Sequence, residues 1–220
     1  MDFVKDFQCC AWIGCGKMAI DLRDGVDFMD VLQVIKNRRS IHTFQPQEVP
    51  DDILIDIFSY ASYAPTHYMK EPWNIKMYQG EGRHKLIDES MASYKRLGMF
   101  ETGSEVKTEK MIASMKDFLL DIPHHALIYM PIEEDPVRYE EEYAAVCAFI
   151  QNAQLAAWIF GVGMLWTITP YMHDAEFVRR IGLCPDEEKV VAVMQIGYPE
   201  KVPRNRGRTP IQEKIEFIRK

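Results

Sequence analysis

The chain has 220 residues, of which 47% are hydrophobic and 27% are charged, which is ordinary for a globular protein with a substantial core. Its formal net charge of −7 argues against a general nucleic-acid-binding protein, because such proteins need a broad basic face. No apolar run is long enough to cross a bilayer, so we expect neither a nucleic acid nor a membrane as a partner.

The cysteines are odd in number and show neither a pairing pattern nor metal-binding spacing; they are Cys9, Cys10, Cys15, Cys147 and Cys184. We therefore expect no disulfide framework and no metal site, which fits a reducing, cytoplasmic location. Residues 1–28 hold three of these cysteines and lack a sustained hydrophobic period. We predict that residues 1–28 form an extension that is dispensable for ligand binding, and that residues 29–220 form one domain.

Helical and extended patterns alternate along residues 29–220. Met29, Leu32 and Ile35 lie at helical spacing, and Pro50 with two aspartates marks the start of the next helix. Further elements are expected at 73–78 (strand), 83–97 and 104–120 (amphipathic), 125–130 (strand), 141–161 (helix), 163–168 (strand), 174–181 (helix) and 190–197 (strand). This order predicts an α+β domain with a mixed or antiparallel sheet flanked by helices.

The segment 141–161 is apolar almost all round and is interrupted only by Gln151, Asn152 and Gln154. A helix of this kind must be buried on most sides, so we expect it at the centre of the molecule. A second subunit is one candidate for part of its cover.

The first of three polar clusters contains Arg38, Arg39, Ser40 and His42, directly after a helix. Arginine presents a planar fork of donors that matches a phosphate group, and serine adds a hydroxyl donor. A solvated basic turn is the alternative interpretation, because charged runs usually face water.

Two more clusters follow. In "APTHYMKEPWNI" (64–75) two prolines fix a loop between a helix and a strand, and the alternative is a rigid connector whose Trp73 packs in the core. In "GYPEKVPRNRGRTP" (197–210) the alternating spacing of the arginines places Arg206 and Arg208 on one side of an extended segment. That arrangement is either a second anion clamp or a solvated tail.

Taken together, "RRSIHTF", "APTHYMKEPW" and the closing "GVGMLWTI…IGYP…RGRTP" resemble the nitroreductase family of flavoenzymes in order and spacing. The resemblance covers roughly residues 29–215. It implies a nitroreductase-like fold and an intertwined homodimer with two FMN molecules at the subunit interface. It also implies NAD(P)H as co-substrate and a small-molecule electron acceptor. No catalytic side chain is required, because the cofactor carries the chemistry.

The resemblance also implies roles for individual residues. Arg38 and Ser40 would hold the FMN phosphate and ribityl chain, with Arg39 helping through its backbone and Arg206 and Arg208 closing on the phosphate. His42 would approach the pyrimidine side of the ring, and Trp166 and Thr167 would lie at the strand end near flavin N5. The residues expected to cover the ring edge of the partner's flavin are Pro65, Thr66, His67 and Met69.

Three departures from the family pattern affect the expected function. His42 replaces a usual arginine or lysine, Met69 and Glu71 replace a usual asparagine and glutamine, and residues 167–169 replace a glycine-rich turn. The leading hypothesis is an FMN-dependent NAD(P)H oxidoreductase that reduces nitroaromatics, quinones or related acceptors. The alternatives are a specialised dehydrogenase or dehalogenase of the same fold, and a flavin-binding protein without turnover.

Overall fold

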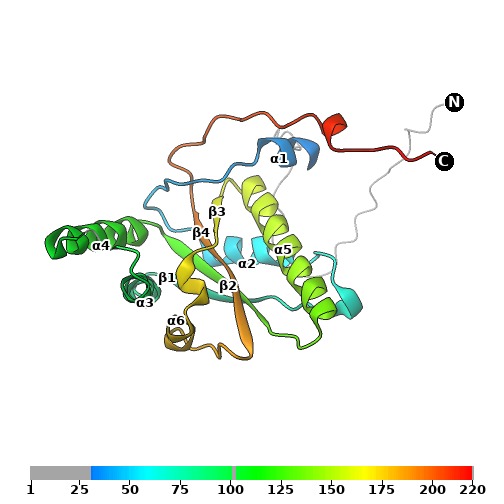
Figure 1. The fold of residues 1–220 in the computed structure, drawn as a ribbon. Coiled ribbons are helices and arrows are strands. Elements are labelled where there is room, and N and C mark those ends of the chain that lie inside the picture. Colours follow the sequence, from blue (N-terminus) through cyan, green and yellow to red (C-terminus); the bar gives the residue numbers. More distant parts are fainter. Residues whose placement is uncertain (1–30, 101–102, 220) are drawn as a thin grey trace.

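Four antiparallel strands in the order β1-β2-β4-β3 form the sheet of the computed structural model, which describes residues 31–100 and 103–219 (Figure 1). The strands are β1 (Asn74–Gln79), β2 (His124–Pro131), β3 (Gly163–Thr167) and β4 (Glu188–Gly197). The central strands β2 and β4 are buried along most of their length, whereas β1 and β3 form the two edges. The expected α+β class is confirmed, and the sheet is antiparallel rather than mixed.

Helices cover both faces of the sheet. One face packs against α2 (Asp51–Ala61) and the long α5 (Pro136–Ile159), and the other packs against α3 (Gly82–Arg96) and α6 (Ala175–Arg180). The remaining helices are α1 (Val31–Asn37) and α4 (Glu105–Leu120), the latter packed on α3 away from the sheet (Figure 1). Side chains alternate along β2, so Ala126 and Ile128 enter the first core and Leu127 enters the second.

Helix α5 lies in the largest core cluster, as its apolar sequence predicts. Its buried side chains include Val146, Phe149 and Ile150, and the Phe149 ring stacks on Trp73 with centroids 4.8 Å apart. The core interpretation of Trp73 is therefore the correct one. Within the described residues, no helix combines the length and apolarity that crossing a lipid bilayer requires.

The first expected helix is present as α1, but its own chain does not bury the apolar side chains that lie at helical spacing. Leu32 and Ile35 are 66% and 53% exposed, and the buried residue of α1 is Val34. Helical spacing shows that residues share a face but does not show that their own chain covers it. Met29 and the expected extension 1–28 lie outside the described residues.

Two adjacent histidines at the start of β2, His124 and His125, are buried. The His124 ring accepts the Val49 backbone N–H at Nε2 (2.8 Å), and His125 Nε2 lies 2.9 Å from the Leu119 carbonyl. Burial is the main cause that lowers the pKa of both imidazoles, that of His125 to about 4. Protonation of either ring is therefore linked to unfolding.

We expect this burial to make the protein sensitive to acid. Because the folded pKa of His125 lies below its ordinary value, the unfolded chain binds a proton that the native state does not. The contribution to stability is complete above about pH 6.5 and is lost as the pH falls toward 4, amounting to about 3 kcal/mol for His125. Urea titrations between pH 4 and 7.5 should show a weaker pH dependence for His125→Gln than for the wild type. Equal slopes for the two proteins would contradict a neutral buried His125.

Candidate functional site

The turn that follows α1 is fastened to the start of β3. The Arg38 N–H still donates to the Val34 carbonyl (2.8 Å), after which Ser40 forms a parallel bridge to Met164. The next residue, Ile41, is fully buried and donates its N–H to the Met164 carbonyl (3.2 Å). This close approach requires Gly163, since a Cβ there would lie 2.6 Å from Ile41 Cγ1. The polar residues 38–42 are thus held at a fixed place beside the sheet.

The chain after β4 passes alongside the same turn. Phe44 bridges Pro199, the Gln45 N–H donates to the Tyr198 carbonyl (2.8 Å), and the Glu200 N–H donates to the Thr43 carbonyl (3.1 Å). The continuing segment then closes a pocket of about 390 Å³ over the turn. This pocket is lined by Arg38, Arg39, Ser40, His42, Pro203, Arg204, Asn205, Arg206 and Arg208. Two sequence motifs more than 150 residues apart therefore meet in one place.

The lining of this arginine pocket contains five arginines and no carboxylate. Burial, followed by the charges of Arg39 and Arg208, lowers the pKa of the Arg38 guanidinium. Arg38 Nη1 makes a long contact of 3.4 Å to Gln154 Oε1, and its buried Nε has no acceptor within residues 31–100 and 103–219. Buried donors in native proteins normally have partners, so this surplus of donors fits an anion with several oxygens, such as a phosphate group.

Arg39 differs from Arg38 because the turn itself uses its guanidinium. Arg39 Nη1 donates to the Lys36 carbonyl (2.8 Å) and to the Arg38 carbonyl (2.6 Å). These bonds satisfy carbonyls that the end of α1 leaves without helical partners. Arg38 is therefore better placed than Arg39 to contact a ligand with its side chain.

The residues expected to cover the ring edge lie apart from the arginine pocket of their own chain. Thr66 and His67 line a second pocket of about 450 Å³, together with Tyr68, Lys70, Asp135, Val137, Arg138, Glu141 and Glu142. Pro65 and Met69 belong to the same loop, and Met69 is 76% exposed. Glu142 lines the second pocket and Gln154 contacts Arg38, and these two residues of α5 are twelve positions apart, which corresponds to about 18 Å along the helix. The same chain does not bring this loop to the arginine pocket.

Trp166 and Thr167 end strand β3, two and three residues after the Met164 position that pairs with Ser40. The Thr167 hydroxyl donates to the Val193 carbonyl (2.6 Å), which ties the strand end to β4. The indole Nε1 of Trp166 is buried and has no acceptor among the described residues. This N–H is a buried donor near the turn, outside the lining of the arginine pocket.

Sequence reasoning missed four contributors to the site. Gln154 reaches Arg38 from α5. The signal in the sequence was its place as one of the few polar residues in the apolar segment 141–161. Pro203, Arg204 and Asn205 line the arginine pocket directly before the expected Arg206 and Arg208. Their only signal was their position in the "PRNRGR" segment, because polar side chains in an irregular segment show no period from which a facing direction follows.

Known proteins resemble this chain over most of its length. The model of the nitroreductase family matches residues 35–198, which includes the basic turn, the loop and β3. YfhC of Bacillus subtilis (strain 168), whose name assigns it provisionally to the NAD(P)H nitroreductases, is 32% identical over 183 residues. This alignment covers 83% of the chain and 91% of YfhC.

Two solved structures share the fold. The nitroreductase-like family protein from Bacillus cereus is 38% identical with a TM-score of 0.77, over 86% of this chain and 96% of that one. Iodotyrosine deiodinase bound to FMN and 3-iodo-L-tyrosine is 18% identical with a TM-score of 0.63, over 86% and 98% of the two chains. The second likeness shows the fold alone, whereas the family match spans most of the chain. The resemblance found in the three motifs is therefore confirmed, and the chain belongs to the nitroreductase family.

Proposed function

We propose that the protein is an FMN-dependent oxidoreductase that takes electrons from NAD(P)H and passes them to nitroaromatics, quinones or related acceptors. The arginine pocket carries this proposal, because its lining gathers five guanidinium groups without a carboxylate and the buried Arg38 Nε has no partner in the part of the chain that the structure describes. Membership of the nitroreductase family and the name of YfhC support it.

The chain's own residues would bind and orient the cofactor. Arg38, Ser40, Arg206 and Arg208 would hold the phosphate and the adjoining chain, and Gln154 would fix the direction of Arg38. The Trp166 N–H would donate to the ring system from the end of β3. When bound, FMN supplies hydride acceptance and electron transfer, so no protein nucleophile is needed.

We also propose that the protein works as a homodimer. Residues 201–219 are exposed throughout, although Ile211, Phe217 and Ile218 are large and apolar. The edge strand β1 and helix α2 border an apolar pocket of about 580 Å³. Exposed apolar surface of this extent is typical of an interaction site. Since the loop 65–69 lies at the other end of α5 from the arginine pocket, it would serve the flavin of a second subunit.

The absorbance spectrum of the purified protein tests the cofactor, and steady NAD(P)H oxidation tests turnover. We expect a yellow protein that oxidises NADH or NADPH when a nitroaromatic or a quinone is added. Release of halide from a halogenated phenol would identify the dehalogenase alternative, and bound FMN without NAD(P)H oxidation would identify a non-catalytic flavoprotein. A colourless protein that takes up no FMN would refute the proposal.

His42 allows a test of how the chain tunes the flavin. It lines the arginine pocket, and an arginine in its place would carry a permanent positive charge. If His42 lies near flavin N1, His42→Arg should stabilise the anionic reduced ring and raise the midpoint potential by the equivalent of about 1 kcal/mol at alkaline pH. Spectroelectrochemical titration at acidic and alkaline pH measures this difference. Identical potentials at alkaline pH would place His42 away from the ring.

A further inference from the structure

The loop from Thr66 to Glu71 adopts a conformation that its residue types disfavour. Tyr68, Met69 and Glu71 have positive φ angles of 51°, 55° and 45°, and every other positive φ among the described residues belongs to glycine. Residues other than glycine rarely adopt positive φ angles, because the Cβ atom crowds the backbone. Strained backbone of this kind persists only where surrounding contacts hold it.

Two large side chains of this loop are also exposed to solvent. Tyr68 is 90% exposed and Met69 is 76% exposed, and the Tyr68 ring stacks on His67 with centroids 4.1 Å apart. Neither backbone strain nor the exposure of apolar surface stabilises a free chain. The conformation therefore needs an anchor, and it presents Tyr68 and Met69 to something outside the subunit.

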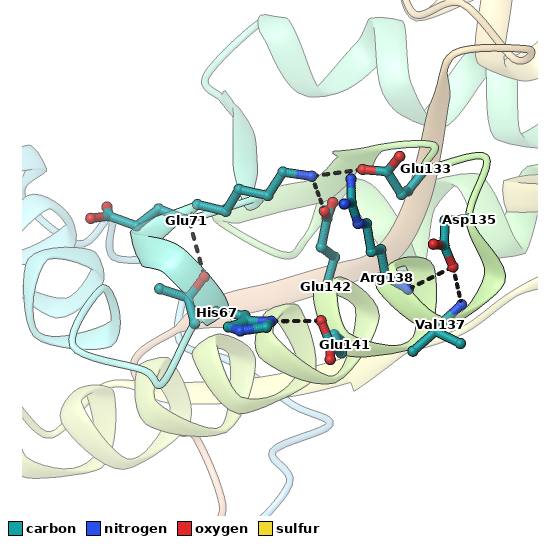
Figure 2. A network of polar contacts seen from close by, with 10 residues as sticks. His67, Glu71, Glu133, Asp135, Val137, Arg138, Glu141 and Glu142 are labelled. Carbon is teal, nitrogen blue, oxygen red and sulfur yellow. Dashed lines mark hydrogen bonds and ion pairs between the residues drawn. The ribbon is translucent and has the colours of Figure 1, made fainter.

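Lys70 is that anchor. Its φ is an ordinary −71°, and its ammonium group returns to the body of the protein, where Nζ pairs with Glu133 Oε2 (2.7 Å) and with Glu142 Oε1 (Figure 2). Glu142 is the only acidic residue among the buried residues of the described chain. A buried carboxylate requires a cation partner, and Lys70 is that partner for Glu142. The Lys70 side chain therefore fixes the loop to α5 and to Glu133 just before it.

Two weaker contacts support the same placement of the loop. His67 Nδ1 lies 2.8 Å from Glu141 Oε2, and the Glu71 N–H donates to the Thr66 hydroxyl (3.1 Å). Both involve exposed groups, and the second lies within the loop itself. Neither reaches a buried partner as Lys70 does.

We propose that Lys70 is a positioning residue: its ion pairs with Glu133 and Glu142 hold the loop 66–71 in its strained form, so that Tyr68 and Met69 face the flavin and substrate of the partner subunit. This inference rests on the proposed function for what the loop faces. The anchoring itself does not depend on that function.

Chymotrypsin cleavage of the cofactor-free protein tests the anchoring. Lys70→Met should accelerate cleavage after Tyr68 at least fivefold, because the loop leaves its held conformation, whereas Lys70→Arg should restore resistance to near the wild-type level. Tyr63, which is 85% exposed and precedes the loop, provides an internal reference. Lys116→Met is the control on another ion pair of a partly exposed lysine, since Lys116 Nζ lies 2.5 Å from Asp88 Oδ1 and its side chain is 36% exposed, against 50% for Lys70.

A second variant separates the loss of anchoring from the effect of the unpaired buried charge of Glu142 that Lys70→Met leaves behind. In Lys70→Met/Glu142→Gln no buried carboxylate lacks a partner, and cleavage after Tyr68 should remain at least fivefold faster than in the wild type. Wild-type resistance in the double variant, or unchanged cleavage in Lys70→Met, would overturn the proposal.

The FMN-loaded protein tests what the loop faces. Lys70→Met should keep its FMN affinity within about threefold, since the arginine pocket lies at the other end of α5. Its flavin fluorescence should rise several-fold, and KM for the acceptor should rise at least tenfold with a smaller change in kcat. Unchanged fluorescence and KM beside accelerated cleavage would refute the positioning role. A wild-type protein without FMN affinity would refute the proposed function and leave the cleavage result standing.

Discussion

Arg38→Met is expected to weaken FMN binding by about 100-fold or more. Hydrogen bonds to charged groups contribute about 1.5–3 kcal/mol each, and the loss of two from one guanidinium corresponds to at least two orders of magnitude in Kd. Methionine keeps an apolar stem of similar length in the half-buried position. Fluorescence titration of the cofactor-free protein with FMN measures the effect.

The same substitution should not destabilise the protein without cofactor. Burial and the nearby Arg39 and Arg208 disfavour the charge of Arg38, as the direction of its pKa shift shows. Removing that charge should leave Tm unchanged or raise it, as happens where a functional group is held at a cost in stability.

Arg39→Met is the control within the same turn. The Arg39 guanidinium donates to two backbone carbonyls, so its loss should lower Tm slightly and change the FMN affinity less than tenfold. Equal losses of affinity in both variants would show that the pocket acts only through its total charge, and no loss in Arg38→Met would remove the phosphate site from this turn.

Replacing Ile215, Phe217 and Ile218 by serine is expected to abolish the homodimer at micromolar concentration. These side chains are 47%, 70% and 82% exposed in the single chain. Burial of each is worth about 1.5–3 kcal/mol, and a twofold-symmetric dimer uses every contact twice. Even half of this free energy would weaken the dimer Kd by several orders of magnitude. Analytical ultracentrifugation measures the mass.

A triple variant of the neighbouring polar residues provides the control. Gln212, Lys214 and Glu216 lie on the same segment, and their replacement by serine leaves the net charge unchanged while preserving the apolar side chains. This variant should keep the wild-type mass. A dimer that survives the apolar substitutions would show that the C-terminal segment is not the interface.

The sequence by itself determined the family and the order of the elements. Hydrophobic periods located every strand within two residues of its observed bounds, because one face or both faces of each strand are buried by neighbours in the same chain. The order and spacing of the three motifs are properties that residue types reveal directly, whereas the close approach of Gly163 to Ile41 is known only from the structure.

Only the tertiary structure decided which polar groups share a site. The meeting of Arg38 with Arg206 and Arg208 depends on the pairing of Phe44 with Pro199, a contact between distant segments that no local pattern encodes. The direction of Gln154 toward Arg38, the left-handed loop around Lys70 and the exposure of Leu32 are likewise results of packing. Periodicity shows which residues lie together on a face, but what covers that face depends on the three-dimensional arrangement of the chain and of the copies that bind it.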